Sequence, residues 1–266
     1  MKGHSRVTAW QYIEELLGMG RYTFTRKEAT RRLKTSPAAV YMALHRLERA
    51  GKVVMLRAGF YVIVDPQHRS TGMMPPEWFI QELMKDLDRP YYVGLLSAAQ
   101  IHGAAHQAPQ EFQVVIPKRS LRPVRSGNVK IRFFGKGLFD RSATIEVKTP
   151  VGFMKVSTPE TTAWDIIRYP RGAGGFDHAV TVLAELAEKI DSAKLMDIVI
   201  RHDEVIVIQR LGYIFERLGR RRLAQALAKR VQHAPIRALD SSMPLKGASV
   251  SRKWGLWVNA KVEAEA

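Results

Sequence analysis

The segment from Thr25 to Val64 constrains the fold of this chain more than any other part of the sequence. It reads TRKEATRRLKTSPAAVYMALHRLERAGKVVMLRAGFYVIV. Thr25 and Glu28 have the spacing of a capping box, in which each side chain bonds a free backbone amide at the start of a helix. Ser36 before Pro37 predicts a second helix start, because Ser is a favoured N-cap and Pro fits the first helical position. We therefore expect two helices joined by a short turn.

The second of these helices has one apolar face and a defined end. Val40, Leu44 and Leu47 follow the spacing i, i+4 and i+7, which places them on one face of a helix and predicts that this face is buried. Gly51 comes directly after, where a helix commonly ends in a left-handed residue. The opposite face is left for solvent or a ligand.

A β-hairpin is predicted after the second helix. Val53–Arg57 and Phe60–Val64 are rich in β-branched and aromatic residues, and Ala58-Gly59 separates them. Two helices, a short turn and a hairpin make up a helix-turn-helix with a wing. The sequence therefore predicts a winged helix-turn-helix, and the function that this motif serves is DNA binding.

In this motif the N-terminal part of the second helix reaches base edges in the major groove. Small side chains let the helix approach closely, Tyr and Arg donate to phosphates or bases, and Met can contact a thymine methyl group. A solvated helix face is the alternative for the arginines. The candidate DNA-contacting residues are Ser36, Ala38, Ala39, Tyr41, Met42, His45, Arg46 and Arg49, with Arg57 in the hairpin.

Charge supports a polyanionic partner. The 266 residues include 42 Lys and Arg against 25 Asp and Glu, a formal net charge of +17, and nucleic acid fits this excess best. The absence of cysteine excludes disulfides and thiolate metal sites. No apolar run approaches the roughly 20 residues of a membrane span, and the first residues lack an apolar signal core. We expect a soluble, cytoplasmic protein without a membrane partner.

The predicted fold class is α+β, with two domains. Residues 1–66 form the winged helix-turn-helix, the polar and turn-rich residues 67–76 form a linker, and residues 77–266 form a mixed domain with a small β-sheet and a C-terminal helical set. Strands are predicted at 111–117, 129–134, 144–149 and 152–157, with short final strands at 236–240 and 254–258. Helices are predicted at 5–18, 75–87, 91–103, 158–169, 177–189, 193–202, 204–218 and 220–232.

One group of residues has the spacing of a catalytic site. Asp140, Glu146 and Lys148 read D-x5-E-x-K, similar to restriction-type nucleases in which carboxylates hold Mg²⁺. The simpler interpretation is that Glu146 and Lys148 form the solvent-facing side of a strand. The sequence contains no P-loop, dinucleotide fingerprint or G-x-S-x-G elbow. We expect no enzyme activity, no catalytic residues, no metal and no cofactor.

A second group of basic residues lies in the predicted sheet. A solvated surface is one interpretation, and contact with the DNA backbone, with an acidic toxin or with RNA is the other. The group contains Lys118, Arg119, Arg122, Arg125, Lys130 and Arg132, followed by Lys136.

Five motifs, in this order, resemble the AbiEi family, the antitoxins and transcriptional regulators of type IV toxin–antitoxin systems in phage defence. They cover nearly the whole chain. The motifs are LRAGFYVI in the predicted wing, YYVGLLSAAQIHG at Tyr91–Gly103, VSTPETTAWDII at Val156–Ile167, QRLGYIFERLG at Gln209–Gly219 and RKWGLWVN at Arg252–Asn259.

The resemblance implies a DNA-binding domain followed by an antitoxin domain. It implies double-stranded DNA as one partner, with an operator of inverted repeats in the protein's own promoter. It also implies a nucleotidyltransferase-like toxin encoded beside it, neutralised with or without direct contact. The alternatives are a plain winged-helix regulator whose second domain senses a ligand or oligomerises, and a metal-dependent nuclease.

Overall fold

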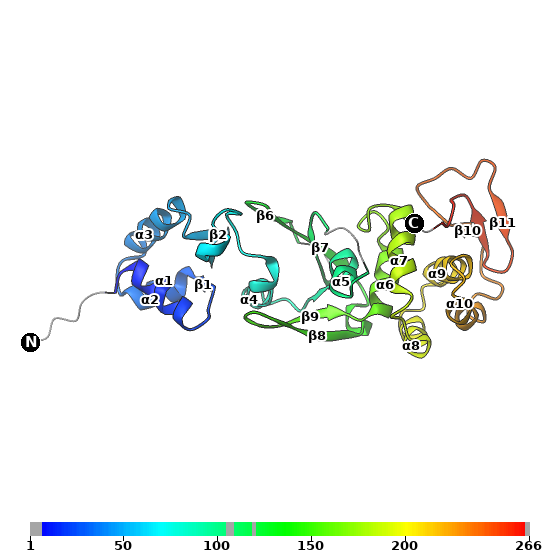
Figure 1. The fold of residues 1–266 in the computed structure, drawn as a ribbon, viewed down its shortest axis with the longest axis horizontal. Coiled ribbons are helices and arrows are strands. Elements are labelled where there is room, and N and C mark those ends of the chain that lie inside the picture. The colour runs from blue at the N-terminus through cyan, green and yellow to red at the C-terminus, as the bar shows by residue number, and fades with distance from the viewer. Residues whose placement is uncertain (1–6, 105–108, 119–120, 264–266) are drawn as a thin grey trace, which may run out of the picture.

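The computed structural model describes residues 7–104, 109–118 and 121–263, and the fold is mixed α+β (Figure 1). The N-terminal unit, blue to cyan in Figure 1, lies at one end of the elongated molecule. Its elements are α1 (Ala9–Gly18), β1 (Thr23–Thr25), α2 (Arg26–Leu33), α3 (Pro37–Arg49), β2 (Val53–Arg57) and β3 (Phe60–Ile63).

The predicted helix starts are confirmed. The Thr25 side chain accepts from the Glu28 amide and the Glu28 carboxylate accepts from the Thr25 amide, which completes a capping box at α2. Ser36 Oγ accepts from the Ala39 amide at 3.2 Å and caps α3. Gly51 follows α3 with a φ of +63°. These local hydrogen bonds define the helix-turn-helix.

The hairpin after α3 is also present. β2 and β3 pair antiparallel, with a register shift between Met55 and Arg57, and β3 pairs on its other side with β1, which the sequence did not predict. The arrangement is consistent with a winged helix-turn-helix. The core of this unit consists of Tyr12, Ile13, Leu16, Phe24, Ala29, Leu33, Val40, Leu44, Val53, Tyr61 and Ile63.

The rest of the described chain begins with a larger sheet than expected. Within the described ranges this sheet has six strands in the order β6-β7-β5-β4-β9-β8. Two helices, α4 (Ile80–Asp86) and α5 (Leu95–Ile101), belong to the same unit. The strands are β4 (Tyr92–Val93), β5 (Phe112–Pro117), β6 (Val124–Ser126), β7 (Val129–Lys136), β8 (Thr144–Thr149) and β9 (Gly152–Ser157).

The prediction of one helix over residues 91–103 is wrong at its start. Tyr92 and Val93 form a strand that pairs with β5 on one side and β9 on the other, and both side chains are fully buried. Gly94 then approaches Val115 so closely that a Cβ would lie 2.8 Å from Val115 Cγ2. A strand buried on both faces has an apolar sequence like that of a buried helix, so the period of the pattern does not separate them.

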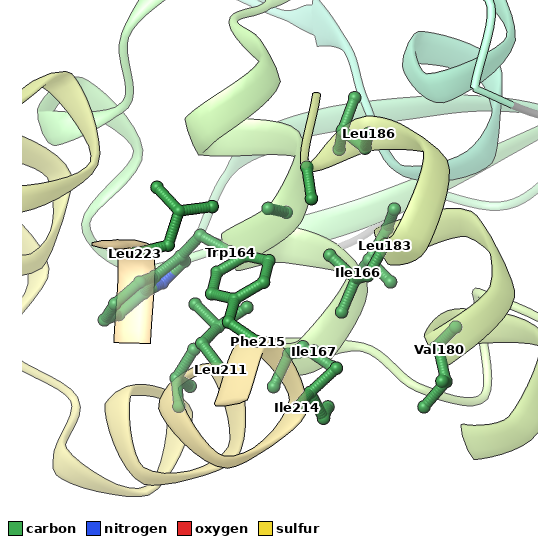
Figure 2. Close-up of a cluster of buried hydrophobic side chains, with 14 of the residues drawn as sticks. Trp164, Ile166, Ile167, Val180, Leu183, Leu186, Leu211, Ile214, Phe215 and Leu223 are labelled. Atoms are coloured by element: carbon green, nitrogen blue, oxygen red, sulfur yellow. The ribbon is translucent and has the colours of Figure 1, made fainter. Parts of the chain in front are cut away.

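The C-terminal part packs helices around a large core (Figure 2). The helices are α6 (Pro159–Arg168), α7 (Phe176–Leu186), α8 (Ser192–His202), α9 (Val205–Arg217) and α10 (Arg221–Ala228). Their apolar faces meet around Trp164, Leu183, Leu211 and Phe215. A small sheet closes this end, in the order β10 (Arg237–Ala238), β12 (Leu256–Val258), β11 (Ser249–Ser251), and β11 was not predicted.

The segment between the two predicted domains is packed. Met73 and Met74 are buried in one apolar cluster with Leu56 and Phe60 of the hairpin, and this cluster continues into the six-stranded sheet. The hairpin therefore has a core on each of its faces. The domain limits at residues 66 and 77 stay predictions.

No helix in the described ranges is long and apolar enough to cross a membrane.

Candidate nucleic-acid interface

Helix α3 presents the face that the sequence predicted. Val40 and Leu44 are fully buried against the rest of the N-terminal unit, so the side opposite to them faces solvent. Tyr41 and Met42, two large side chains on this face, are 47% and 52% exposed. All the predicted contact residues on this helix are exposed, namely Ser36, Ala38, Ala39, Tyr41, Met42, His45, Arg46 and Arg49.

The Tyr41 ring is held in place by two neighbours. The His45 ring stacks on it with centroids 6.2 Å apart, one turn further along α3. The Arg26 guanidinium of α2 lies 5.5 Å from the Tyr41 ring centroid. Sequence reasoning missed Arg26, because its approach to Tyr41 depends on how α2 crosses α3. Together these side chains offer a planar ring beside a cation, which suits stacking and phosphate contact.

The acidic side chain of α3, Glu48, lies at the edge of this face, with one carboxylate oxygen 3.9 Å from His45 Nδ1. Glu48 is half-buried, and its carboxylate accepts from the Met55 amide of β2 at 3.2 Å. Arg46 and Arg49 form no ion pair within the part of the chain that the structure describes. The exposed side of α3 is therefore positive, with no carboxylate in its middle to repel a phosphate.

Arg57, expected to contact DNA from the hairpin, lies beside an acidic side chain of the same chain. Its guanidinium lies 3.6 Å from the Asp86 carboxylate of α4, and both side chains are about a third exposed. At this exposure an ion pair is weak and exchangeable. A contact between Arg57 and DNA would compete with Asp86.

The second group of basic residues predicted from the sequence is only partly gathered on one surface. Arg125 and Lys130 lie directly opposite each other on β6 and β7, where two like charges repel. Lys118 and Arg122 are also exposed, whereas Arg132 pairs with Glu111 at 3.6 Å. Arg119 lies outside the described residues. Because β6 contacts β2, this hairpin lies beside the N-terminal unit (Figure 1).

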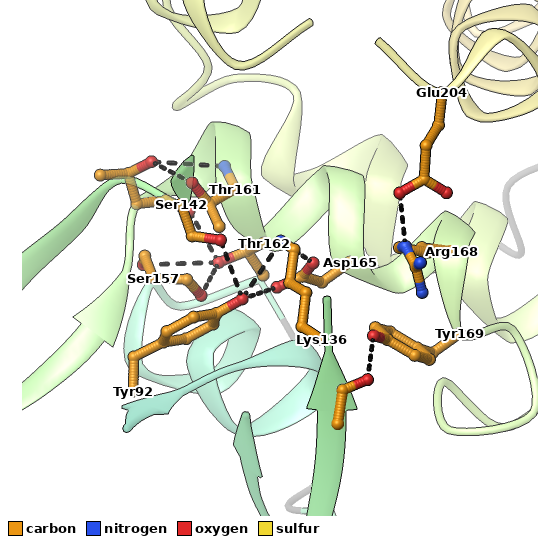
Figure 3. A network of polar contacts seen from close by, with 12 residues as sticks. Tyr92, Lys136, Ser142, Ser157, Thr161, Thr162, Asp165, Arg168, Tyr169 and Glu204 are labelled. Carbon is orange, nitrogen blue, oxygen red and sulfur yellow. Dashed lines mark hydrogen bonds and ion pairs between the residues drawn. The ribbon is translucent and has the colours of Figure 1, made fainter. Parts of the chain in front are cut away.

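Lys136 does not belong to that surface, which corrects the grouping made from sequence. It is buried, and its ammonium lies 2.6 Å from Asp165 Oδ1 and 3.2 Å from the Tyr92 hydroxyl (Figure 3). The Tyr92 hydroxyl in turn donates to Asp165 Oδ2 at 2.7 Å. Burial and the neighbouring Asp165 carboxylate raise the pKa of Tyr92. A buried charge pair satisfied in this way joins β7, β4 and α6.

The strand-to-helix junction within VSTPETTAWDII also stabilises the fold, as the buried Lys136 does. Thr158 caps α6 by accepting from the Thr161 amide. The hydroxyls of Ser157 and Thr162 are 2.7 Å apart and both residues are fully buried (Figure 3). This motif therefore positions α6 on the sheet.

His202 is a buried histidine beside the same network. Its ring stacks on the Trp164 indole with centroids 5.4 Å apart, and neither ring nitrogen has a hydrogen-bond partner within the described chain. Burial, together with the nearby Lys136 ammonium, lowers the pKa of His202 to about 3. The imidazole is therefore neutral at physiological pH.

The nuclease-like residues do not form a metal site. Asp140, Glu146 and Lys148 are all exposed, and Glu146 and Lys148 lie on the edge strand β8. Over the described ranges, no three His, Asp or Glu side chains are close enough to hold one ion. Nothing here assembles the catalytic group that the spacing suggested.

Comparisons with known proteins agree with this geometry. Residues 92–217 match the model of the AbiEi antitoxin C-terminal domain, and residues 11–64 match that of the AbiEi antitoxin transcriptional regulator. The crystal structure of the RV2827C protein from Mycobacterium tuberculosis shares the fold, with a TM-score of 0.69 and 15% identity over 96% of this chain and 93% of that one. No curated protein matches the chain.

Proposed function

The chain belongs to the AbiEi family of antitoxins and transcriptional regulators, and from this we propose that it represses its own promoter and neutralises a toxin encoded beside it. The first role is assigned to the winged helix-turn-helix at residues 1–66. The second is assigned to residues 77–266, with a nucleotidyltransferase-like protein as the toxin. Both roles work by binding, without catalysis.

The observation that carries the DNA-binding role is the exposed face of α3. Tyr41 and Met42 are half exposed with no apolar neighbour element covering them, and Arg46 and Arg49 lie beside them without an acidic partner in the described chain. Exposed apolar side chains between arginines suit base edges and thymine methyl groups better than they suit water. In this proposal α3 enters the major groove.

The basic β6–β7 hairpin, which contacts β2 of the N-terminal unit, is assigned to the DNA surface as well. Arg125 and Lys130 repel each other in the free protein, and a phosphate between them would remove that repulsion. The hairpin turn lies against the segment that follows β3, since a Cβ at Gly127 would be 3.6 Å from the Thr71 carbonyl. Phosphate contacts there would position the protein on DNA without reading its sequence.

The experiment separates the two roles in the full-length chain. Promoter repression and growth rescue from the neighbouring toxin are measured in the same cells for wild type, Arg46→Ala and a matched control, Lys229→Ala, which removes the same charge from an exposed position after α10. Arg46→Ala should lose repression and keep rescue, whereas Lys229→Ala should keep both. Full repression by a double Tyr41→Ala, Arg46→Ala variant would show that α3 is not the reading helix.

A direct binding assay then identifies the kind of contact. Arg46→Ala should weaken binding to the operator more than binding to random DNA, because a lost base contact costs roughly 1–3 kcal/mol of discrimination. Arg57→Ala should weaken both evenly, as loss of a phosphate contact would. If no toxin gene lies beside this one, or if the full chain fails to rescue growth, the antitoxin role is refuted while the DNA-binding role stands.

A further inference from the structure

The edge strand β8 carries exposed charged and apolar side chains that contacts within one copy of the described chain do not explain. It is the last strand of the six-stranded sheet, and the structure leaves Thr144, Ile145, Glu146 and Lys148 exposed, with Val147 partly buried between them. The opposite edge, β6, has only three residues and lies against β2. Edge strands present unpaired N–H and C=O groups that can hydrogen-bond another strand. β8 is the longer and more open edge of this sheet.

The register of β8 with β9 shows which side chains share a face. Glu146 lies opposite Lys155 and Lys148 lies opposite Phe153, so these four residues share the solvent-facing side. Val147 lies opposite Met154, which is buried in the core on the other side. Phe153 is 57% exposed, and Ile145 is 43% exposed at the edge itself.

We propose that β8 pairs antiparallel with β8 of a second copy, with the two Val147 residues facing each other on the two-fold axis. In this register Glu146 of each copy lies directly opposite Lys148 of the other, and Ile145 lies opposite Thr149. Directly opposite residues of opposite charge stabilise an antiparallel pair. The two sheets join into one continuous sheet.

Charge complementarity indicates that the strand pairing with β8 comes from a second copy of this chain. The sequence Glu146-Val147-Lys148 is complementary to itself only when it is reversed about Val147, which is the relationship that a two-fold axis imposes. Within the described residues, neither Glu146 nor Lys148 forms an ion pair inside its own chain. Pairing would satisfy both charges and shield Ile145. Glu146 and Lys148, which the sequence grouped with Asp140 in a nuclease-like spacing, act in association in this proposal, whether or not the protein binds DNA.

Charge reversal tests the register. Sedimentation equilibrium is run on the full chain up to roughly 1 mM, because an interface below about 1,200 Å² is typical of weak complexes. Glu146→Lys and Lys148→Glu should each weaken self-association at least about tenfold, because each places like charges opposite each other at two positions. The double variant should associate as the wild type does, and a mixture of the two single variants should form a heterodimer.

A cysteine scan gives a second readout, since the chain contains no cysteine. Val147→Cys should form a disulfide-linked dimer on mild oxidation, because facing Cα atoms in an antiparallel pair lie within disulfide range. Thr144→Cys is the control, since its two copies would be about 20 Å apart.

Three outcomes would overturn the proposal. The first is a wild-type chain that stays monomeric over the whole concentration range. The second is association that the charge reversals leave unchanged, which would place the interface elsewhere. The third is cross-linking at Thr144→Cys as efficient as at Val147→Cys, which would indicate random collision.

Discussion

The six-membered ring of the Trp254 indole lies directly against the backbone of Gly212. A Cβ on Gly212 would overlap three atoms of that ring. The indole nitrogen donates to the Glu216 carboxylate, one turn further along α9, at 2.6 Å. Two motifs that lie about 40 residues apart in the sequence, QRLGYIFERLG and RKWGLWVN, therefore form one contact that holds the C-terminal sheet against α9.

Gly212→Ala should destabilise the protein by about 1–3 kcal/mol, the usual cost of overpacking a close contact. Denaturant unfolding of the full chain measures this change. Gly137→Ala is the matched control, because a Cβ at Gly137 meets no atom within 4 Å. Equal stabilities for the two variants would mean that Trp254 moves aside without cost.

Met74→Ala should destabilise the protein by roughly 2–5 kcal/mol, as truncation of a buried Met does. Met74 is fully buried although it lies in the segment predicted as a polar linker. Gln67→Ala, at an exposed position of the same segment, should have little effect. Thermal unfolding compares the two. A silent Met74→Ala would mean that the hairpin and the six-stranded sheet are not coupled through this segment.

His202 should make the protein less stable at acidic pH. The pKa of His202 is about 3 in the folded protein and near 6.5 in the unfolded chain. At pH values between these two, only the unfolded chain binds the proton. Stability is therefore lost as pH falls from about 6.5 toward 3, by about 1.4 kcal/mol between pH 7.5 and 5.5. Unfolding free energies of wild type and His202→Phe at the two pH values measure this term.

His233→Phe, at an exposed histidine, is the control for losing one imidazole. If the wild type and His202→Phe lose the same stability on acidification, then His202 is hydrated or protonated in the folded protein.

DNA binding should depend on salt through both basic regions. Each phosphate contact contributes a slope of about −0.9 to log K against log salt. A double Arg125→Ala, Lys130→Ala variant should therefore reduce the magnitude of the slope by up to about 1.8 and leave the preference for the operator unchanged. Fluorescence anisotropy with operator and random duplexes measures both quantities. An unchanged slope would remove the β6–β7 hairpin from the DNA surface.

The sequence by itself determined the local features of this protein. The Thr25–Glu28 capping box, the Ser36 cap and the exposed face of α3 depend on residues three or four positions apart, and hydrogen bonding and helical period act over that range. The alternation of side chains along β8 has an equally local origin, the two-residue period of a strand.

Only the tertiary structure decided what lies opposite each side chain. Lys136 had the same sequence surroundings as the exposed Lys130, but Asp165, 29 residues later, meets it in the interior. Tyr92 belongs to a strand because β5 and β9 flank it, whereas its apolar neighbours suit a helix equally well. A sequence pattern reports which face of an element is apolar and not which element covers it. The free energy of burial is non-directional, so the choice of partner depends on the whole fold.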